Sequence, residues 1–460
     1  MSAGAGMGRW AVAIAVGLAV VAAAPAVGAE TGHGALGAEL SLWWITPFAL
    51  MLLAIAVLPL AAERWWHPNR SKMIVSAGLG LPVVGLFLYM DHHAVLHTAE
   101  EYVSFIILLG ALFVISGGIV VRTDMRATPL TNTAMLALGS VLASFMGTTG
   151  AAMVLIRPVL LTNQQRTRKT HTIIFFTFLV ANIGGCLTPL GDPPLFMGYL
   201  KGVPFEWTFG LAPAWAAVVA TVLLIYFVLD TIMYTREPIA ALEADKLEIQ
   251  PTRVTGLWLN GPLLAGVVLA VAFLNENYLP FKAFPLREGV LLALAAASWA
   301  ATPRGYRQAN KFTFYPIIEV AALFAGIFAT MIPAILILKA RGGDLGVASP
   351  ASFFWATGVL SAFLDNTPTY VVFFSLAQNP DIPGYAQSVA TTGVDELILT
   401  AISLGAVFMG AMTYIGNAPN FMVKAIAEER GVRMPSFFGY LLWSTAVLMP
   451  VFVGVTFLFL

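Results

Sequence analysis

Residues 182–194 read Asn182-Ile-Gly-Gly-Cys-Leu-Thr-Pro-Leu-Gly-Asp-Pro-Pro194, a polar stretch rich in glycine and proline between two apolar segments. A second stretch, Thr413-Tyr-Ile-Gly-Asn-Ala-Pro-Asn420, shares its pattern, Thr-x-(Leu or Ile)-Gly-(Asp or Asn)-x-Pro. Inside a bilayer, interrupted backbone persists only where protein or a water-filled cavity satisfies its free polar groups. Paired interruptions in corresponding halves of a chain are typical of transporter binding sites. We therefore predict two broken transmembrane helices, at about 171–200 and 396–428.

Each interruption follows a second unusual segment, in which a short polar tip separates two apolar arms. The tips read Gly147-Thr-Thr-Gly150 and Asp365-Asn-Thr367, within segments at about 130–161 and 351–377. Arms of roughly 10–15 residues are shorter than the about 20 residues that a helix needs to cross a bilayer. We predict that both segments are re-entrant hairpins, because hairpin and broken helix recur in the same order.

The composition is that of a polytopic membrane protein. Of the 460 residues, 59% are hydrophobic and 10% are charged, whereas a soluble domain carries about 25% charged residues. The net charge is zero, so nothing indicates a nucleic-acid partner. Cys186 is the only cysteine, which excludes an intrachain disulfide and a cysteine metal cluster. No nucleophile–base pair or metal-ligand spacing indicates an enzyme, and no cofactor is expected.

The chain divides into two halves. Residues 1–29 have the layout of a secretory signal peptide, and an uncleaved first helix is the alternative. A polar linker at 232–255, whose charges fit a solvated connector, separates a first half, 43–231, from a second half, 256–460. The expected fold is all-α with about 10–11 spans; the apolar spans outside the hairpins and broken helices lie at about 43–62, 72–90, 102–121, 209–231, 256–275, 286–301, 313–338 and 436–459.

Lysine and arginine are distributed unequally between alternate loops, and the richer loops are expected in the cytoplasm. If both hairpins re-enter, one set of loops holds 18 of the 24 basic residues, the other holds five, and Arg9 precedes them all. The linker is then cytoplasmic, the first hairpin enters from the cytoplasm, and the second hairpin and the C-terminus lie outside. The two halves then have opposite orientations in the membrane and are inverted repeats, as the repeated motif also suggests.

Both hairpin tips and both broken helices are expected to meet near the middle of the membrane. Free carbonyls of broken helices, together with Thr and Asn oxygens, suit a cation such as Na⁺. Taken singly, each Thr or Asn also fits helix capping or interhelical hydrogen bonding. The candidate binding residues are Thr148, Thr149, Asn182, Gly184, Thr188, Asn366, Thr367, Thr413 and Asn417. The candidate Na⁺ ligands are Thr149, Asn182, Asp365, Asn366 and Asn417.

Three acids lie in the predicted membrane segments, where carboxyl groups are costly and usually functional. Asp192 lies in the first break, Asp365 at the second tip, and Glu319 in an apolar helix without an obvious local partner. A carboxyl that alternately holds H⁺ and Na⁺ provides the minimal chemistry of exchange. Asp365 is the first candidate, because it is the acid at a hairpin tip. The structural alternatives are a helix N-cap for Asp192 and an interfacial position for Glu319.

At these residues the chain resembles the ion transporter superfamily, which includes NhaD-type sodium/proton antiporters, arsenite permeases, citrate–metal transporters and divalent-anion/sodium symporters. The resemblance covers about 43–460 and is nearest to the NhaD-like or citrate-transporter (CitMHS-like) branch. It implies a dimerising scaffold domain and a mobile transport domain carrying both hairpins, which work as an elevator in the bacterial inner membrane. The matching stretches are Asn182–Pro194, Tyr315–Pro333, Leu364–Thr369 and Thr413–Asn420.

Sodium/proton exchange is the expected function, with Na⁺ and H⁺ as the transported ions. The superfamily's symporters carry Ser-Asn-Thr at both tips, and this chain departs from that pattern. A polycarboxylate beside Asp365 would meet like-charge repulsion, and neither tip nor break contains a lysine or arginine. Sodium- or proton-coupled citrate or carboxylate transport is the alternative, as is arsenite permeation. The expected partners are membrane lipid, small ions and a second copy of the chain in a homodimer.

Overall fold

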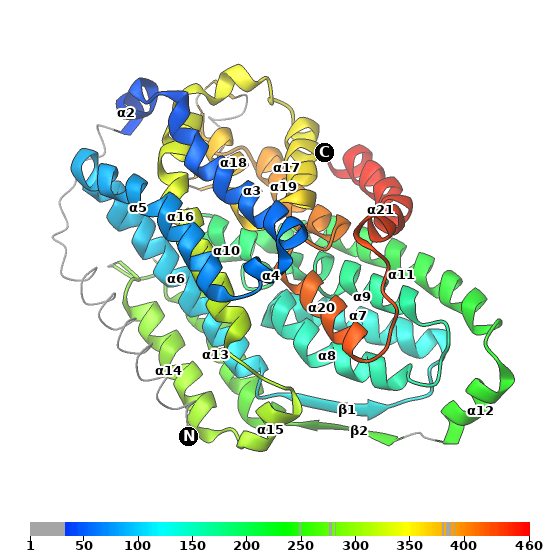
Figure 1. The fold of residues 1–460 in the computed structure, drawn as a ribbon. Coiled ribbons are helices and arrows are strands. Elements are labelled where there is room, and N and C mark those ends of the chain that lie inside the picture. Colours follow the sequence, from blue (N-terminus) through cyan, green and yellow to red (C-terminus); the bar gives the residue numbers. More distant parts are fainter. Residues whose placement is uncertain are drawn as a thin grey trace.

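A computed structural model describes residues 33–460 except 248–249, 276–277, 281, 380, 383–387 and 391. The expected signal peptide or first helix at 1–29 lies outside the described residues. Within the described part, the chain is mostly helical, and a two-stranded ribbon crosses one end of the helices (Figure 1).

The elements of the first half, up to the linker, follow one another with short connections. They are α2 (His33–Glu39), η1 (Leu42–Ile45), α3 (Thr46–Ala61), α4 (Glu63–Trp66), α5 (Asn69–Met90), α6 (His92–Ser116), β1 (Val120–Asp124), α7 (Pro129–Met146), α8 (Thr148–Thr162), α9 (Thr170–Leu179), η2 (Ile183–Leu187), α10 (Pro193–Leu200), η3 (Phe205–Leu211) and α11 (Ala212–Tyr234).

The linker and the second half contain the remaining elements. They are α12 (Ile239–Leu247), β2 (Gln250–Thr255), α13 (Leu257–Phe273), α14 (Leu286–Ala301), α15 (Arg304–Ala309), α16 (Tyr315–Arg341), η4 (Gly342–Leu345), α17 (Pro350–Phe363), α18 (Asn366–Ala377), α19 (Glu396–Met409), η6 (Gly410–Met412), α20 (Ala418–Glu429) and α21 (Phe437–Phe459).

Eight helical segments of the described chain are long and apolar enough to cross a membrane. Fewer segments meet this length than the 10–11 expected spans, partly because α13 and α14 have only 17 and 16 residues. Large apolar side chains also cover outward faces: Phe438, Leu442 and Phe457 of α21 are 72–85% exposed. The chain is therefore a multi-pass helical membrane protein. The eight segments are Leu42–Pro59, Asn69–Met90, His92–Ser116, Pro129–Met146, Thr170–Leu187, Phe205–Tyr234, Tyr315–Arg341 and Phe437–Phe459.

Two pairs of helices occupy the positions predicted for the hairpins. Helices α7 and α8 meet at Gly147, whose φ of +78° is a conformation that glycine adopts without steric cost. Helices α17 and α18 meet at Leu364 and Asp365, and the Asp365 carboxylate caps α18 by accepting from the Thr367 N–H. The arm α7 has 18 residues, so the expected limit of 10–15 residues is wrong for that arm.

The two interruptions have matching local conformations. Thr188 and Thr413 are extended, with φ, ψ of −141°, 158° and −135°, 168°. Asp192 and Asn417, four residues later in each motif, have −141°, 139° and −152°, 142°. A proline then follows within the first two positions of α10 and of α20, where a missing N–H costs little. The repeated motif thus forms the same break twice.

Hydroxyl groups from neighbouring helices satisfy several carbonyls of the broken segments. Ser144 donates to the Gly184 carbonyl at 2.5 Å, and Thr208 donates to that of Leu187 at 3.1 Å. In the second half, Tyr440 donates to the Ala411 carbonyl at 3.0 Å, and Ser444 to that of Met412 at 2.6 Å. The breaks therefore persist at depth because the surrounding protein replaces the missing helical hydrogen bonds.

The linker is more ordered than the sequence suggested. Its strand β2 pairs antiparallel with β1, and Arg122 lies opposite Arg253. Glu237 is buried and accepts from the backbone N–H groups of Thr167 and Arg168 at 3.0 and 2.7 Å. Burial raises the pKa of the Glu237 carboxyl, but these hydrogen bonds and the nearby Arg166 guanidinium bring it below its ordinary value. The expectation of an all-α chain is thus wrong for this segment, and that of a solvated connector is wrong for buried Glu237 and Asp245, whereas the linker's other described charged residues are exposed.

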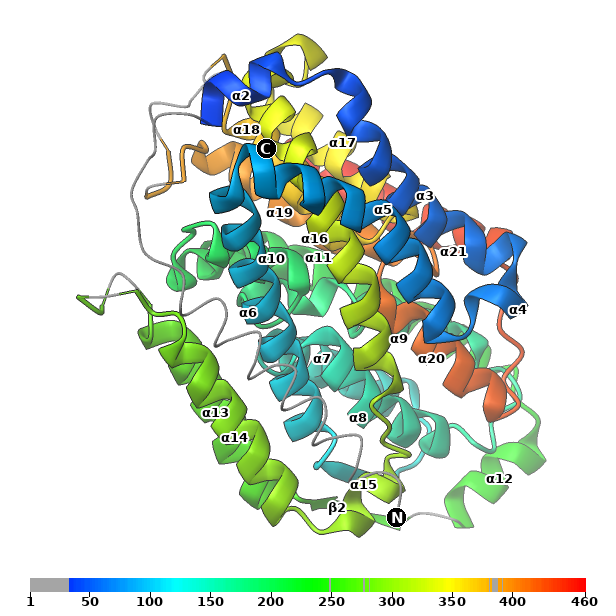
Figure 2. The ribbon, with the colours of Figure 1, turned by 60° about the vertical axis from the view of Figure 1, so that its left-hand side comes forward.

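Helices α5 and α6 pack closely against α16. Gly80 of α5 approaches Ala329 of α16, and small residues at such crossings let membrane helices pack closely. Phe105 of α6 stacks on Phe324 of α16 with ring centroids 4.7 Å apart. Figure 2 shows α13 and α14 as a pair along one flank, beside α6.

Candidate functional site

Asp192 lies at the point where both hairpin tips and both breaks converge. Its carboxylate is fully buried and accepts three hydrogen bonds from neutral side chains. Thr148 of the first tip donates to Oδ1 at 3.0 Å, and Asn417 of the second break donates to the same oxygen at 3.1 Å. Asn366 of the second tip donates to Oδ2 at 2.5 Å. One carboxylate thus connects four elements that are far apart in the sequence.

Backbone contacts fix each tip against a break. The Thr148 N–H donates to the Gly191 carbonyl at 2.9 Å. The Thr188 hydroxyl donates to the Ser144 carbonyl, and Thr413 donates to the Ala362 carbonyl at the corresponding place in the second half. These contacts explain how Thr188 and Thr413 contribute: they hold the hairpin arms in place, and no hydrogen bond joins either of them to Asp192 among the described residues.

Asn182 forms a second contact between the breaks. Its Nδ2 donates to Asn420 Oδ1 and to the Thr177 carbonyl, both at 2.7 Å. Asn420 in turn donates to the carbonyls of Gly410 and Thr413, both at 2.9 Å. The sequence analysis did not propose Asn420 for the site, although it ends the second motif. Asn182 Oδ1 is buried without a hydrogen-bond partner in the described part of the chain, which leaves an acceptor for a cation.

The remaining binding candidates lie at the edge of this cluster. Thr149 is half-buried, and none of the cluster's hydrogen bonds among described residues involves it. Gly184 is a packing position, because a Cβ there would lie 2.7 Å from the Ser140 carbonyl oxygen. The Thr367 hydroxyl donates to Asn366 Oδ1 at 3.4 Å. Gly184 and Thr367 therefore support the residues that bind Asp192, whereas Thr149 makes no contact that gives it such a role among the described residues.

The two central acids have exchanged the roles that the sequence favoured. Asp192 occupies the N-cap position of α10, but its side chain makes no capping hydrogen bond and faces the cluster instead. Asp365 is half-buried and caps α18 through the Thr367 N–H at 3.0 Å. Among the described residues, Asp192 is thus the acid that both hairpin tips contact.

Glu319 is paired elsewhere. Its carboxylate lies 2.8 Å from the Nζ of Lys72, near the start of α5, and Lys72 also donates to the His67 carbonyl at 3.1 Å. The partner of Glu319 thus comes from a distant part of the sequence, and the partly exposed pair fits the interfacial alternative for this acid. The pair fits a contact between α5 and α16 rather than a member of the Asp192 cluster.

The cluster is poor in charge. Two basic side chains near the described membrane segments pair with other acids, Arg166 with Asp230 and Lys201 with Glu101, and no described lysine or arginine forms an ion pair with Asp192. No group of three or more His, Cys, Asp or Glu gathers anywhere in the described part of the chain. Amide and hydroxyl groups around one carboxylate suit a proton or a monovalent cation better than a tightly bound divalent metal.

Two hairpins, two broken helices and a buried acid where they meet are features typical of transporter binding sites. The chain matches a family described as "Putative citrate transport" over residues 37–460, and it belongs to that family. It is also similar to two uncharacterised transporters, one from Mycobacterium bovis and one from Mycobacterium tuberculosis. Each is 26% identical over 330 residues, which cover 66% of this chain and 71% of the relative.

The comparisons confirm the expectation of a membrane transporter, and among the functions considered they favour citrate transport. They give no support to sodium/proton exchange or to the NhaD branch in particular.

Proposed function

We propose that this protein transports a citrate-class carboxylate together with a cation, H⁺ or Na⁺. The family match supports the substrate class. The observation that carries the mechanism is the convergence of both hairpin tips and both breaks on Asp192. This alternative replaces sodium/proton exchange, the function first expected.

Asp192 is the proposed coupling group. A buried ionised carboxylate is costly unless it is paired, and the described side chains that contact Asp192 are all neutral donors. A proton or Na⁺ at Asp192 removes that cost. Asn182 Oδ1 is a buried acceptor without a partner among described residues, and it lies near the second tip: a Cβ at Gly410 would be 3.2 Å from it and 3.5 Å from Asn366 Nδ2. Asn182 is therefore a proposed Na⁺ ligand.

The same acid explains why a carboxylate would need a co-transported cation. Two like charges 4 Å apart repel by about 4 kcal/mol at an effective dielectric constant of about 20. A polycarboxylate next to ionised Asp192 would meet this repulsion, because the described contacts of Asp192 come from Thr148, Asn366 and Asn417 and from no lysine or arginine. Binding of the cation first removes the charge of Asp192 and allows the anion to bind. The anion can therefore be transported only together with the cation.

The proposed motion is that of an elevator. The two hairpins and two broken helices form the mobile unit, and α3, α5, α6, α13, α14 and α16 form the scaffold. The two halves act as inverted repeats. The matched conformations of Thr188 with Thr413, and of Asp192 with Asn417, support the repeat relation.

The test is uptake of radiolabelled citrate into proteoliposomes, with an inward Na⁺ gradient, an inward proton gradient, or neither. We expect uptake to exceed that of protein-free vesicles and to rise with at least one of the two gradients. A pH-sensitive dye inside the vesicles reports proton movement in parallel. Sodium-driven proton efflux without any citrate uptake would contradict the proposal and restore sodium/proton exchange.

Glu319→Gln is expected to leave citrate uptake within about twofold of the unmodified protein while lowering the free energy of unfolding by about 1 kcal/mol. Glu319 is partly exposed, so the ion pair with Lys72 contributes modestly to stability. Uptake and thermal unfolding of the purified protein measure the two effects. Loss of uptake at unchanged stability would instead give Glu319 a role in coupling.

A further inference from the structure

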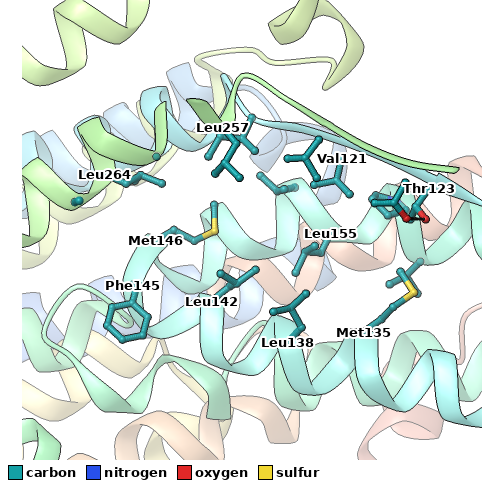
Figure 3. Close-up of a pocket in the computed structure, with 18 of the residues that line it drawn as sticks. Val121, Thr123, Met135, Leu138, Leu142, Phe145, Met146, Leu155, Leu257 and Leu264 are labelled. Atoms are coloured by element: carbon teal, nitrogen blue, oxygen red, sulfur yellow. Dashed lines mark hydrogen bonds between the residues drawn. The ribbon is translucent and has the colours of Figure 1, made fainter. Parts of the chain in front are cut away.

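A long apolar cavity of about 670 Å³ separates the first hairpin from α13 (Figure 3). Its walls come from α7, α8, α13 and the β1–β2 ribbon. Met135, Leu138 and Leu142 of α7 line one side, and Leu257 and Leu264 of α13 line the other. A volume of this size falls within the about 300–1,000 Å³ range of small-molecule sites. The walls are almost entirely hydrocarbon, so an apolar ligand fits them best.

The ribbon over this cavity has two different faces. Val121, Thr123, Thr252 and Val254 line the cavity, and the two threonine hydroxyls hydrogen-bond to each other at 2.7 Å. Side chains alternate along a strand, so the intervening arginines lie on the other face. Because the hydroxyls of Thr123 and Thr252 bind each other, neither needs a polar partner inside the cavity.

Arg122 and Arg253 lie directly opposite each other on that other face. Both are exposed, and neither forms an ion pair with any residue that the structure describes. Like charges directly opposite each other in a ladder destabilise the pairing. An anion shared by the two guanidinium groups would remove this repulsion, because guanidinium groups bind phosphate well.

We infer that this cavity holds an acyl chain of an anionic phospholipid whose phosphate binds Arg122 and Arg253. The hydrocarbon walls fit the chain, and the arginine pair, which lies across the ribbon from the cavity, fits the charge of a headgroup bound at the edge of the ribbon. Basic residues near a membrane surface attract anionic lipid. The acyl chain of a neutral lipid would fill the cavity, but its headgroup would not neutralise the charge of the two arginines.

The bound chain would lie between the first hairpin and α13. In the proposed function, these elements belong to the mobile unit and to the scaffold. An anionic lipid should then change the rate of citrate uptake, and this effect rests on the proposed function. Binding of the lipid does not rest on it, so a binding measurement and an uptake measurement can fail separately.

The test of binding is native mass spectrometry of the purified protein with phosphatidylglycerol and with phosphatidylcholine. We expect selective retention of phosphatidylglycerol, which the double variant R122A/R253A lowers about tenfold or more. The matched control R64A/R304A removes two exposed arginines elsewhere and should retain the lipid like the unmodified protein. Ala265→Phe, which fills the cavity from α13, should lower the retention of both lipids.

A photoreactive phosphatidylglycerol tests the unmodified protein directly. We expect cross-linked peptides from 135–159 and 257–269. Equal retention by R122A/R253A and by the control would overturn the inference, as would cross-links confined to other helices. A change of oligomeric state in Ala265→Phe with unchanged lipid retention would also overturn it, because the cavity would then be an interface between two copies of the chain.

Discussion

Asp192→Asn is expected to lower cation-coupled citrate uptake about 100-fold or more, with the protein still folded. The asparagine side chain has nearly the same shape but cannot hold a proton or a charge. Its NH2 group would also replace one carboxylate oxygen, and would then face either the amide donor of Asn366 or the donors of Asn417 and Thr148. Each hydrogen bond to a charged group contributes about 1.5–3 kcal/mol, and about 2.7 kcal/mol corresponds to 100-fold. Radiolabelled citrate uptake under a Na⁺ or proton gradient measures the effect.

Asp365→Asn is the matched control for this prediction. Asp365 caps α18, and asparagine is an equally good N-cap residue. We therefore expect its uptake to stay within about tenfold of that of the unmodified protein, with little change in thermal unfolding. The reverse result, in which Asp192→Asn still takes up citrate and Asp365→Asn does not, would assign the coupling role to Asp365.

Gly191→Ala is expected to destabilise the protein by about 3 kcal/mol or more and to lower the yield of monodisperse protein sharply. A Cβ at Gly191 would lie 2.2 Å from the Gly185 carbonyl oxygen and 2.9 Å from the Ser144 Cα. Both are backbone atoms, so no side-chain rotation relieves the overlap. The first break would have to separate from the hairpin arm at Ser144. Size-exclusion chromatography and thermal unfolding of the purified protein measure the outcome.

Gly289→Ala provides the control for this second prediction. A Cβ at Gly289 of α14 meets nothing within 4 Å, and alanine favours a helix more than glycine does. We expect this variant to unfold at the same temperature as the unmodified protein or above it. Equal stability of Gly191→Ala and Gly289→Ala would show that the close approach at the first break is absent.

The two helix interruptions could be predicted from the sequence, because local chemistry produces them. Glycine and proline stop a helix through their own backbone, and extended Thr188 and Thr413 follow from that local pattern. The turn between α7 and α8 is also produced locally, because its glycine, Gly147, adopts a φ of +78° without steric cost. Composition and long apolar runs likewise predicted a multi-pass membrane protein, since the bilayer selects helices of a certain length.

The paired strands could not be predicted in this way. Residues 120–121 were assigned to the end of a span, 122–124 to the loop that follows it, and 250–255 to a solvated linker. Each strand exists because the other supplies its hydrogen bonds, with Val121 opposite Val254. The partner of Glu319 was missed for the same reason, since Lys72 is distant in sequence and reaches it only after α5 packs on α16.

The sequence by itself indicated the four segments that meet at Asp192, whereas the tertiary structure decided which of their side chains contact it. Both acids stand at the start of a half-helix, so local reasoning could not tell which one caps and which one faces the others. Asn366 and Asn417 reach Asp192 across 174 and 225 residues, and Asn182 reaches Asn420 across 238. A helix break depends on neighbours within a few residues, whereas the direction of a buried side chain depends on every helix packed around it.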